Sequence, residues 1–175
     1  MRRARPDDLD FIVAQESRPD FAQLIGCWDY ATHADNLGHP NLEYWIVDSE
    51  PGEPEGFVIL SGLQSPHRAI ELTRIVMKEP GRGRGRKACE QVLRYVFDTL
   101  RAHRLSLDVI ETNERAARLY ASLGFKREGL MRDAFRRGEG YRSLILMSLL
   151  EAEYRAPRDA TARRPGSGPT PVDSS

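Results

Sequence analysis

The chain has 175 residues, a length that fits one domain able to fold without disulfides or metals. Its 26 Lys and Arg residues balance its 26 Asp and Glu residues, which argues against nucleic acid or an anionic lipid surface as the partner. The two cysteines, Cys27 and Cys89, lie too far apart in sequence for a disulfide framework or a zinc motif, and we expect no bound metal. No apolar run approaches the ~20 residues of a membrane-spanning helix, and the N-terminus lacks a signal-peptide pattern. We therefore expect a cytoplasmic protein.

The first half of the chain predicts two helical stretches followed by a β-meander. Acidic residues after Pro6 and the apolar spacing that follows predict a first helix. A second helical stretch is expected from about Phe21 toward Leu37, broken near Gly26. Apolar and β-branched runs separated by turn residues then predict strands over residues 44–47, 57–60 and 70–77.

The second half alternates strands and helices. A glycine-rich loop is expected over residues 78–85, then a helix to about Leu100 and a strand over residues 105–109. Asn113 can cap a further helix, which Gly124 would end, and a final hairpin turns at residues 138–140. This order predicts the α/β class, with a mixed sheet flanked by helices in one domain over residues 1–155. Residues 156–175 are rich in Pro, Gly, Ser, Thr and Arg without apolar periodicity, which predicts a disordered C-terminal tail.

The glycine-rich loop is the most informative segment. Three glycines alternate with three arginines immediately before a helix, in the order Gly81, Arg82, Gly83, Arg84, Gly85, Arg86. Glycine lets the backbone approach a ligand closely, and the first N–H groups of a helix lack partners within the helix. With the helix dipole and the arginine side chains, the pattern indicates a site for phosphate.

Several kinds of loop could produce this pattern. A P-loop needs a hydroxyl residue after its lysine, but Ala88 follows Lys87 here. A dinucleotide fingerprint needs a third glycine where Arg86 stands. Two interpretations stay open from the loop alone: a metal-free pyrophosphate loop, such as one for coenzyme A, and a solvated arginine-rich turn.

Three segments taken together resemble the GNAT superfamily of N-acetyltransferases. They are Ile70–Met77, Gly81–Arg86, and Leu107–Tyr120 with the Leu123-Gly124-Phe125 that follows. The motifs occur in the family's order and spacing, most densely from Ile70 to Phe125. The resemblance, which includes the ribosomal-protein N-terminal acetyltransferases, implies a GNAT-like fold: a mostly antiparallel central sheet with a splayed pair of parallel strands. It also implies acetyl-CoA as the cosubstrate.

The resemblance further implies which residues bind the coenzyme. The backbone of Ile75, Val76 and Met77 would bond the pantetheine arm, and the loop from Gly81 to Arg86 would hold the pyrophosphate. Asn113 matches the asparagine that contacts the coenzyme, and Tyr120 matches the tyrosine that protonates the departing thiolate. The loop departs from the family pattern, because Pro80 stands where Gln or Arg is common and the loop looks shorter than its commonest form.

Acetyl transfer to an amine also needs a group that accepts the proton of the ammonium. Two carboxylates are candidates for this base. Glu71 matches the position used by some histone-type members of the family, and Asp108 matches the glutamate of some ribosomal-protein N-terminal acetyltransferases. Each carboxylate could instead be an exposed or ion-paired strand residue.

We therefore expect an acetyl-CoA-dependent N-acetyltransferase that acts by direct transfer in a ternary complex. The expected acceptor is a primary amine of a protein, a peptide or a small molecule, and the enzyme would be a monomer or homodimer without nucleic-acid or membrane partners. One alternative is a CoA-binding regulatory module that has lost catalysis. Another is a nucleic-acid-binding domain that uses Arg82, Arg84, Arg86 and Lys87 on phosphates.

Overall fold

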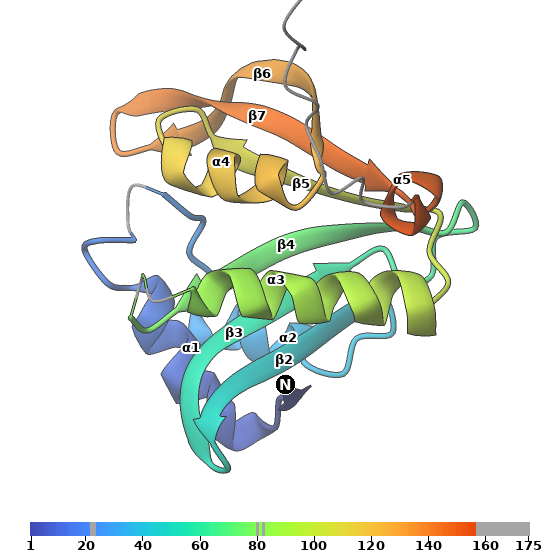
Figure 1. Ribbon diagram of the computed structural model, residues 1–175. Helices are drawn as coiled ribbons and strands as arrows, with labels where there is room; N and C mark the ends of the chain where they lie inside the picture. The colour runs from blue at the N-terminus through green and yellow to red at the C-terminus, as the bar shows by residue number, and fades with distance from the viewer. Residues whose placement is uncertain (22–23, 80, 82, 157–175) are drawn as a thin grey trace, which may run out of the picture.

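The computed structural model describes residues 1–156 except 22–23, 80 and 82. Its centre is a seven-stranded mixed sheet in the order β1-β2-β3-β4-β5-β7-β6. Figure 1 shows α3 and α4 on one face of this sheet and α1 and α2 on the other. Among the described residues, no helix is long and apolar enough to cross a membrane. The expected C-terminal tail lies outside the described residues from position 157 onward.

The N-terminal half holds the elements from β1 to β4. They are β1 (Arg2–Arg3), a 3₁₀ turn (Pro6–Asp8), α1 (Leu9–Glu16), α2 (Tyr30–Asn36), β2 (Leu42–Glu50), β3 (Glu53–Ser61) and β4 (Ala69–Met77). The first predicted helix and the three predicted strands are confirmed. The helical stretch expected from Phe21 toward Leu37 is confirmed after its break near Gly26, where α2 lies. It is wrong before that break, because the described residues between α1 and α2 form turns and irregular backbone. Asp29 sets the start of α2, since its side chain accepts from the N–H of Thr32 at 2.8 Å.

The second half follows the predicted alternation. Its elements are α3 (Arg84–Arg94), a π-helical turn (Tyr95–Thr99), β5 (Arg104–Ile110), α4 (Glu114–Ser122), β6 (Lys126–Arg137), β7 (Gly140–Leu150) and α5 (Glu151–Arg155). Asn113 caps α4 as expected, with its Oδ1 3.2 Å from the N–H of Ala116. Gly124 follows α4 at φ +102°, the left-handed conformation that ends a helix most readily at glycine.

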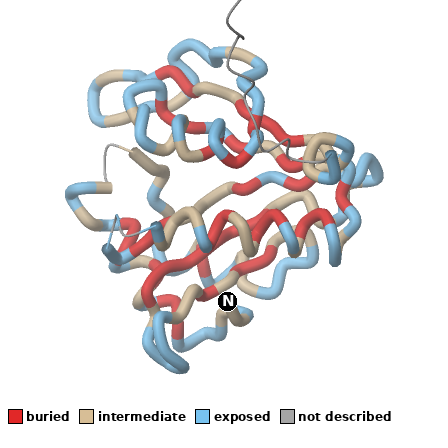
Figure 2. Tube along the Cα trace, viewed as in Figure 1, coloured by how far each residue is buried: buried red, intermediate tan, exposed pale blue. Residues whose placement is uncertain are grey.

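Two apolar clusters hold the helices against the sheet, and both appear as buried segments in Figure 2. Cys89, Val92 and Phe97 pack from the α3 side, which confirms that Cys89 is a buried thiol. Ile12 of α1 and Phe57 of β3 belong to the cluster on the opposite face. Each large side chain buried in this way stabilises the fold by ~1.5–3 kcal/mol. The sheet is therefore a rigid platform between two helical layers.

Strands β4 and β5 separate along their length, and this positions the site. They run parallel but pair only where Ala69–Glu71 meets Arg104–Ser106. Beyond that point β4 still pairs with β3 as far as Met77, and β5 still pairs with β7 as far as Ile110. The edges of β4 and β5 that face each other are thus left unpaired. This confirms the mostly antiparallel sheet with one splayed parallel pair.

Candidate active site

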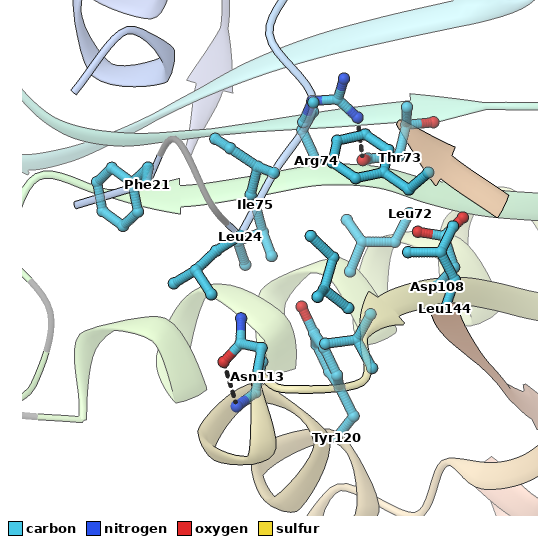
Figure 3. A pocket seen from close by; sticks show the side chains of 16 residues that line it. Phe21, Leu24, Leu72, Thr73, Arg74, Ile75, Asp108, Asn113, Tyr120 and Leu144 are labelled. Carbon is cyan, nitrogen blue, oxygen red and sulfur yellow. Dashed lines mark hydrogen bonds between the residues drawn. The ribbon is translucent and has the colours of Figure 1, made fainter. Parts of the chain in front are cut away.

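Two cavities adjoin at the point where β4 and β5 separate. The inner cavity, of about 240 Å³, lies between β4, β5 and α4 and is shown in Figure 3. The loop cavity, of about 560 Å³, lies between the end of β4, the start of α3 and α4. Residues that line both cavities are Phe21, Leu24, Ile75, Asn113, Ala116 and Tyr120. The two spaces are therefore neighbours with Tyr120 in their common wall.

The glycine-rich loop forms one wall of the loop cavity. Gly81 and Gly83 have φ angles of +111° and +72°, which side-chain-bearing residues rarely adopt, and Gly83 is the residue from which α3 begins. The N–H of Arg84 bonds to Gly81 O and that of Lys87 to Gly83 O. Gly85 and Arg86 stand in the first turn of α3, at the positive end of its dipole, where helix amides can bind an anion.

The three arginines of the loop differ in what their side chains do. Arg86 lines the loop cavity, and its guanidinium donates to Ser122 Oγ. Arg84 instead pairs with Glu55, with 2.7 Å between Nη1 and Oε1, although without the alignment of a good hydrogen bond. Its guanidinium is thus committed to β3, while its backbone begins α3. Arg82 lies outside the described residues.

The end of β4 supplies apolar walls and an open backbone edge. The side chain of Ile75 lines both cavities, and that of Met77 lines the loop cavity. The side chain of Val76 points to the opposite face, into the cluster under α1. Because β5 no longer pairs with this part of β4, the peptide groups on that edge are available to a ligand lying between the strands.

Asn113 and Tyr120 reach the cavities from the start and the body of α4. In Figure 3 the hydroxyl of Tyr120 points from α4 into the inner cavity, and the amide of Asn113 stands beside it. The ring of Tyr120 is buried and lies 5.7 Å from that of Phe125. No described residue hydrogen-bonds to the hydroxyl. Burial, aided by Cys89 and Asp108, raises the pKa of Tyr120 far above that of a free phenol, so the hydroxyl stays protonated at neutral pH.

The two candidate bases share the opposite face of the sheet. Glu71 is paired with Ser106, and Asp108 lies two residues further along β5, so both side chains project from one face. Desolvation raises the pKa of Asp108, while Arg74 opposes the change. Desolvation and the charge of Asp108 raise the pKa of Glu71, again opposed by Arg74. Asp108 lines the inner cavity, whereas Glu71 lies beside Asp108 and does not line the cavity.

The inner cavity therefore connects the two faces of the sheet. Tyr120 and Ala116 border it from the α4 side, and Asp108 and Arg74 border it from the other. Arg74 and Arg115 are lining residues that the sequence did not single out. For Arg74 one signal was present, a charged side chain inside the otherwise apolar run from Ile70 to Met77.

Comparison with known proteins identifies this architecture. The model of the acetyltransferase (GNAT) family matches residues 10–125. The chain belongs to this family. It is 34% identical over 120 residues to spermidine N(1)-acetyltransferase of Escherichia coli strain K12, a match that covers 67% of this chain and 64% of the relative. The chain thus spans somewhat less than two thirds of that relative's length. It is also 28% identical over 100 residues to a putative ribosomal N-acetyltransferase of Bacillus subtilis, which covers 57% of this chain and 55% of the relative.

Solved structures confirm the GNAT fold. Spermidine N-acetyltransferase from Vibrio cholerae, in complex with CoA and spermine, superimposes with a TM-score of 0.79 and 22% identity. The superposition covers 87% of this chain and 95% of that one. The predicted GNAT-like sheet is therefore confirmed by both the strand pairing and this likeness.

Proposed function

We propose that this GNAT protein is an N-acetyltransferase that moves an acetyl group from acetyl-CoA directly to a primary amine. The observation that supports this most is the meeting of the two cavities at Tyr120. A coenzyme in the loop cavity would present its thioester where an amine in the inner cavity can reach it. Direct transfer needs both substrates bound together in this way, within ~3–3.5 Å of each other at the reacting atoms.

The loop cavity has the groups that a coenzyme A molecule requires. The amides of Gly85 and Arg86 and the guanidinium of Arg86 would hold the pyrophosphate. The open edge of β4 from Ile75 to Met77 would bond the amides of the pantetheine arm. Asn113 would contribute the side-chain amide nitrogen that its capping bond leaves over.

The inner cavity would prepare the amine. A primary amine with a pKa near ~10.4 arrives as ammonium and must lose a proton before it can attack. Asp108, with Glu71 beside it, would accept that proton directly or through water. The pKa values of both carboxyls are raised, and therefore lie closer to neutral pH than those of ordinary carboxyls. A pKa nearer the working pH makes a carboxylate a stronger base.

Tyr120 would serve the leaving sulfur. The nitrogen–carbon bond forms as the carbon–sulfur bond breaks, and the proton that the nitrogen loses balances the thiolate. Complete proton loss from a phenol with so high a pKa to a thiolate is unfavourable, because thiols have pKa values near ~8.5. We therefore assign to Tyr120 the donation of a hydrogen bond that stabilises the thiolate as charge develops. The unpaired, protonated hydroxyl is in the state that this role needs.

The alternative of a nucleic-acid-binding surface loses its main support. It required the loop arginines as a cluster directed at phosphates, but the guanidinium of Arg84 is committed to Glu55. A non-catalytic CoA-binding module would share the loop cavity, so the distinction between it and an enzyme rests on turnover.

Coenzyme binding is tested by thermal denaturation with and without acetyl-CoA. Ligand at 100 times its dissociation constant stabilises a protein by ~2.7 kcal/mol, so the melting temperature should rise with ligand concentration. Gly83→Asp places a carboxylate at the start of α3 and should abolish the shift, whereas Gly138→Asp, in the distant β6–β7 turn, controls for the loss of a glycine with positive φ. An unchanged melting temperature at millimolar acetyl-CoA would contradict the proposed site.

A further inference from the structure

A buried carboxylate fixes one wall of the inner cavity. Glu16, the last residue of α1, has a fully buried side chain. Its Oε2 accepts from the N–H of Trp28 at 2.8 Å and lies 3.3 Å from His33 Nε2. Its Oε1 lies 3.2 Å from Nε of Arg74. A fully buried carboxylate with three partners cannot move without leaving buried charge unpaired, so it acts as a fixed anchor.

Arg74 is held by this anchor at the edge of the cavity. Its Nη1 donates to Thr73 O at 3.0 Å, and its Cζ lies 4.8 Å from the centre of the Trp28 ring. Gly26 packs so closely that an added Cβ would lie 3.1 Å from Cζ and would overlap Nη2. The guanidinium is thus positioned by contacts with β4, α1 and the segment before α2, and Figure 3 shows it bordering the cavity.

Donor groups of Arg74 remain available on this edge. Its single contact with Glu16 is through Nε, rather than the two-point contact of a typical arginine–carboxylate pair. No described residue accepts a hydrogen bond from Nη2. An arginine fork that borders a cavity with spare N–H groups suits a carboxylate ligand in geometry and charge.

The charges of the cavity wall are balanced. Among the described residues that line the inner cavity, Arg74 and Asp108 are the ones with charged side chains. The hairpin that contributes Phe135 to this wall carries an excess of positive charge in its sequence, with Arg132, Arg136, Arg137 and Arg142 against Asp133 and Glu139. Glu71 lies beside Asp108 on the same face but does not line the cavity. A second ammonium group on the acceptor that lay near Arg74 would meet a guanidinium, and like charges repel.

We infer that the acceptor is a primary amine that also carries a carboxylate, with Arg74 as the residue that selects it. The ammonium would face Asp108 and the carboxylate would face the guanidinium of Arg74. This rests on the proposed N-acetyltransferase function and specifies its substrate class. The class differs from the spermidine named for the relatives in Escherichia coli and Vibrio cholerae.

The test compares acceptors matched in length. Glycine, β-alanine and γ-aminobutyrate are paired with ethylamine, propylamine and butylamine, in which a methyl group replaces the carboxylate. They are also paired with ethylenediamine, trimethylenediamine and putrescine, in which an aminomethyl group replaces it. Thiol release from acetyl-CoA gives kcat/KM for each. We expect one amino acid of the series to exceed its alkylamine by roughly tenfold or more, because charge-assisted hydrogen bonds are strong and desolvated here. The matching diamine should be the poorest of the three.

Variants assign the preference to Arg74. Arg74→Met should bring the kcat/KM of the amino acid down to that of its alkylamine, so that their ratio falls to about one, and leave acetyl-CoA affinity nearly unchanged. Since Arg74→Met leaves Glu16 without its cation, a second variant, Glu16→Gln with Arg74→Met, removes both charges together. Arg104→Met is the matched control, because Arg104 of β5 pairs with Glu128 of β6 and lines neither cavity.

The possible outcomes distinguish failure of the inferred acceptor class from failure of the proposed N-acetyltransferase function. If the amines are acetylated but no amino acid exceeds its alkylamine, or if the preference survives both Arg74 variants, the inference is wrong and the N-acetyltransferase function stands. Preference for the diamines would also overturn it. If acetyl-CoA binds and no amine of any class is acetylated, the proposed function fails, and the inference falls with it.

Discussion

Tyr120 stands in a chemical environment that keeps it protonated and unpaired. Its hydroxyl is directed at the inner cavity, and burial holds its pKa above the range in which it would ionise. Such a hydroxyl stabilises charge that appears only as the carbon–sulfur bond breaks, so it lowers the barrier without tightening coenzyme binding.

Tyr120→Phe keeps the ring and its contact with Phe125 and removes only this donor. Turnover should fall at least tenfold, since loss of one hydrogen-bond donor to charge that develops in the transition state typically costs ~10²–10³-fold. Acetyl-CoA affinity and melting temperature should change little. Tyr95→Phe is the matched control, because the hydroxyl of Tyr95 donates to Glu43 Oε1 at 3.0 Å and lines neither cavity. Normal turnover of Tyr120→Phe on a verified acceptor would make Tyr120 a packing residue.

The proposed catalysis needs Asp108 and Glu71 in their charged form, whereas the folded state favours their neutral form. Folding raises the pKa of both carboxyls, so each favours the folded state below its unfolded pKa near ~4 and loses that advantage as pH rises through the folded value. Asp108→Asn removes a charged form that the fold disfavours at neutral pH. Its melting temperature at pH ~7 should therefore equal or exceed that of the wild type.

The rate should respond in the other direction. In the wild type, kcat/KM should fall as pH drops through the raised carboxyl pKa, above the ~4 of an ordinary aspartate. Asp108→Asn should lose at least tenfold of the rate, most severely just above the carboxyl pKa, where the wild-type carboxylate is ionised and neutral amine is still scarce. Glu71→Gln should lose less, because Glu71 does not line the cavity. The measurement is kcat/KM against pH beside thermal denaturation. A stability loss without a rate loss would make Asp108 a structural residue.

At the scale of elements, the strand order and the loop–helix junction followed from local signals. Alternating apolar residues predicted β2 to β5, and glycines with Asn113 predicted where α3 and α4 begin and where α4 ends. The part of the predicted helical stretch between Phe21 and α2 is not helical. Apolar spacing alone cannot show that Glu16, in the helix before it, accepts a hydrogen bond from the N–H of Trp28. That contact stabilises an irregular segment in place of a helix.

Sequence patterns could not predict side-chain pairs between residues that are distant in the sequence. The repeat of Gly and Arg suggested three equivalent phosphate ligands, yet Glu55 on β3 engages Arg84. The backbone oxygen of Glu55 also accepts a hydrogen bond from the N–H of Lys78 at 2.6 Å. Together these contacts fasten the loop to β3, a role that depends on strand pairing and not on the motif. The role of Arg74 in the cavity wall was not predicted for the same reason, since its partner Glu16 lies on α1.

At the scale of the whole molecule, the splay of β4 from β5 joins the two faces of the sheet. The glycine-rich loop and Tyr120 lie on the α3 and α4 face, and Asp108 and Glu71 lie on the other. In the proposed reaction, the two substrates would approach the cavity between the strands from opposite sides and meet at Tyr120. The domain over residues 1–155 with a tail over 156–175 stays a prediction, since residues from 157 onward are not described.

The central claim is tested most directly by release of coenzyme thiol from acetyl-CoA by the purified protein, measured with and without an amine, together with mass spectrometry of the amine. The account predicts release that depends on both substrates, saturates with each, and yields N-acetylated amine in equal amount to free thiol. Release that is independent of the amine would indicate hydrolysis alone. Tight binding of acetyl-CoA without acetylation of any amine would contradict the claim and favour a non-catalytic coenzyme-binding module.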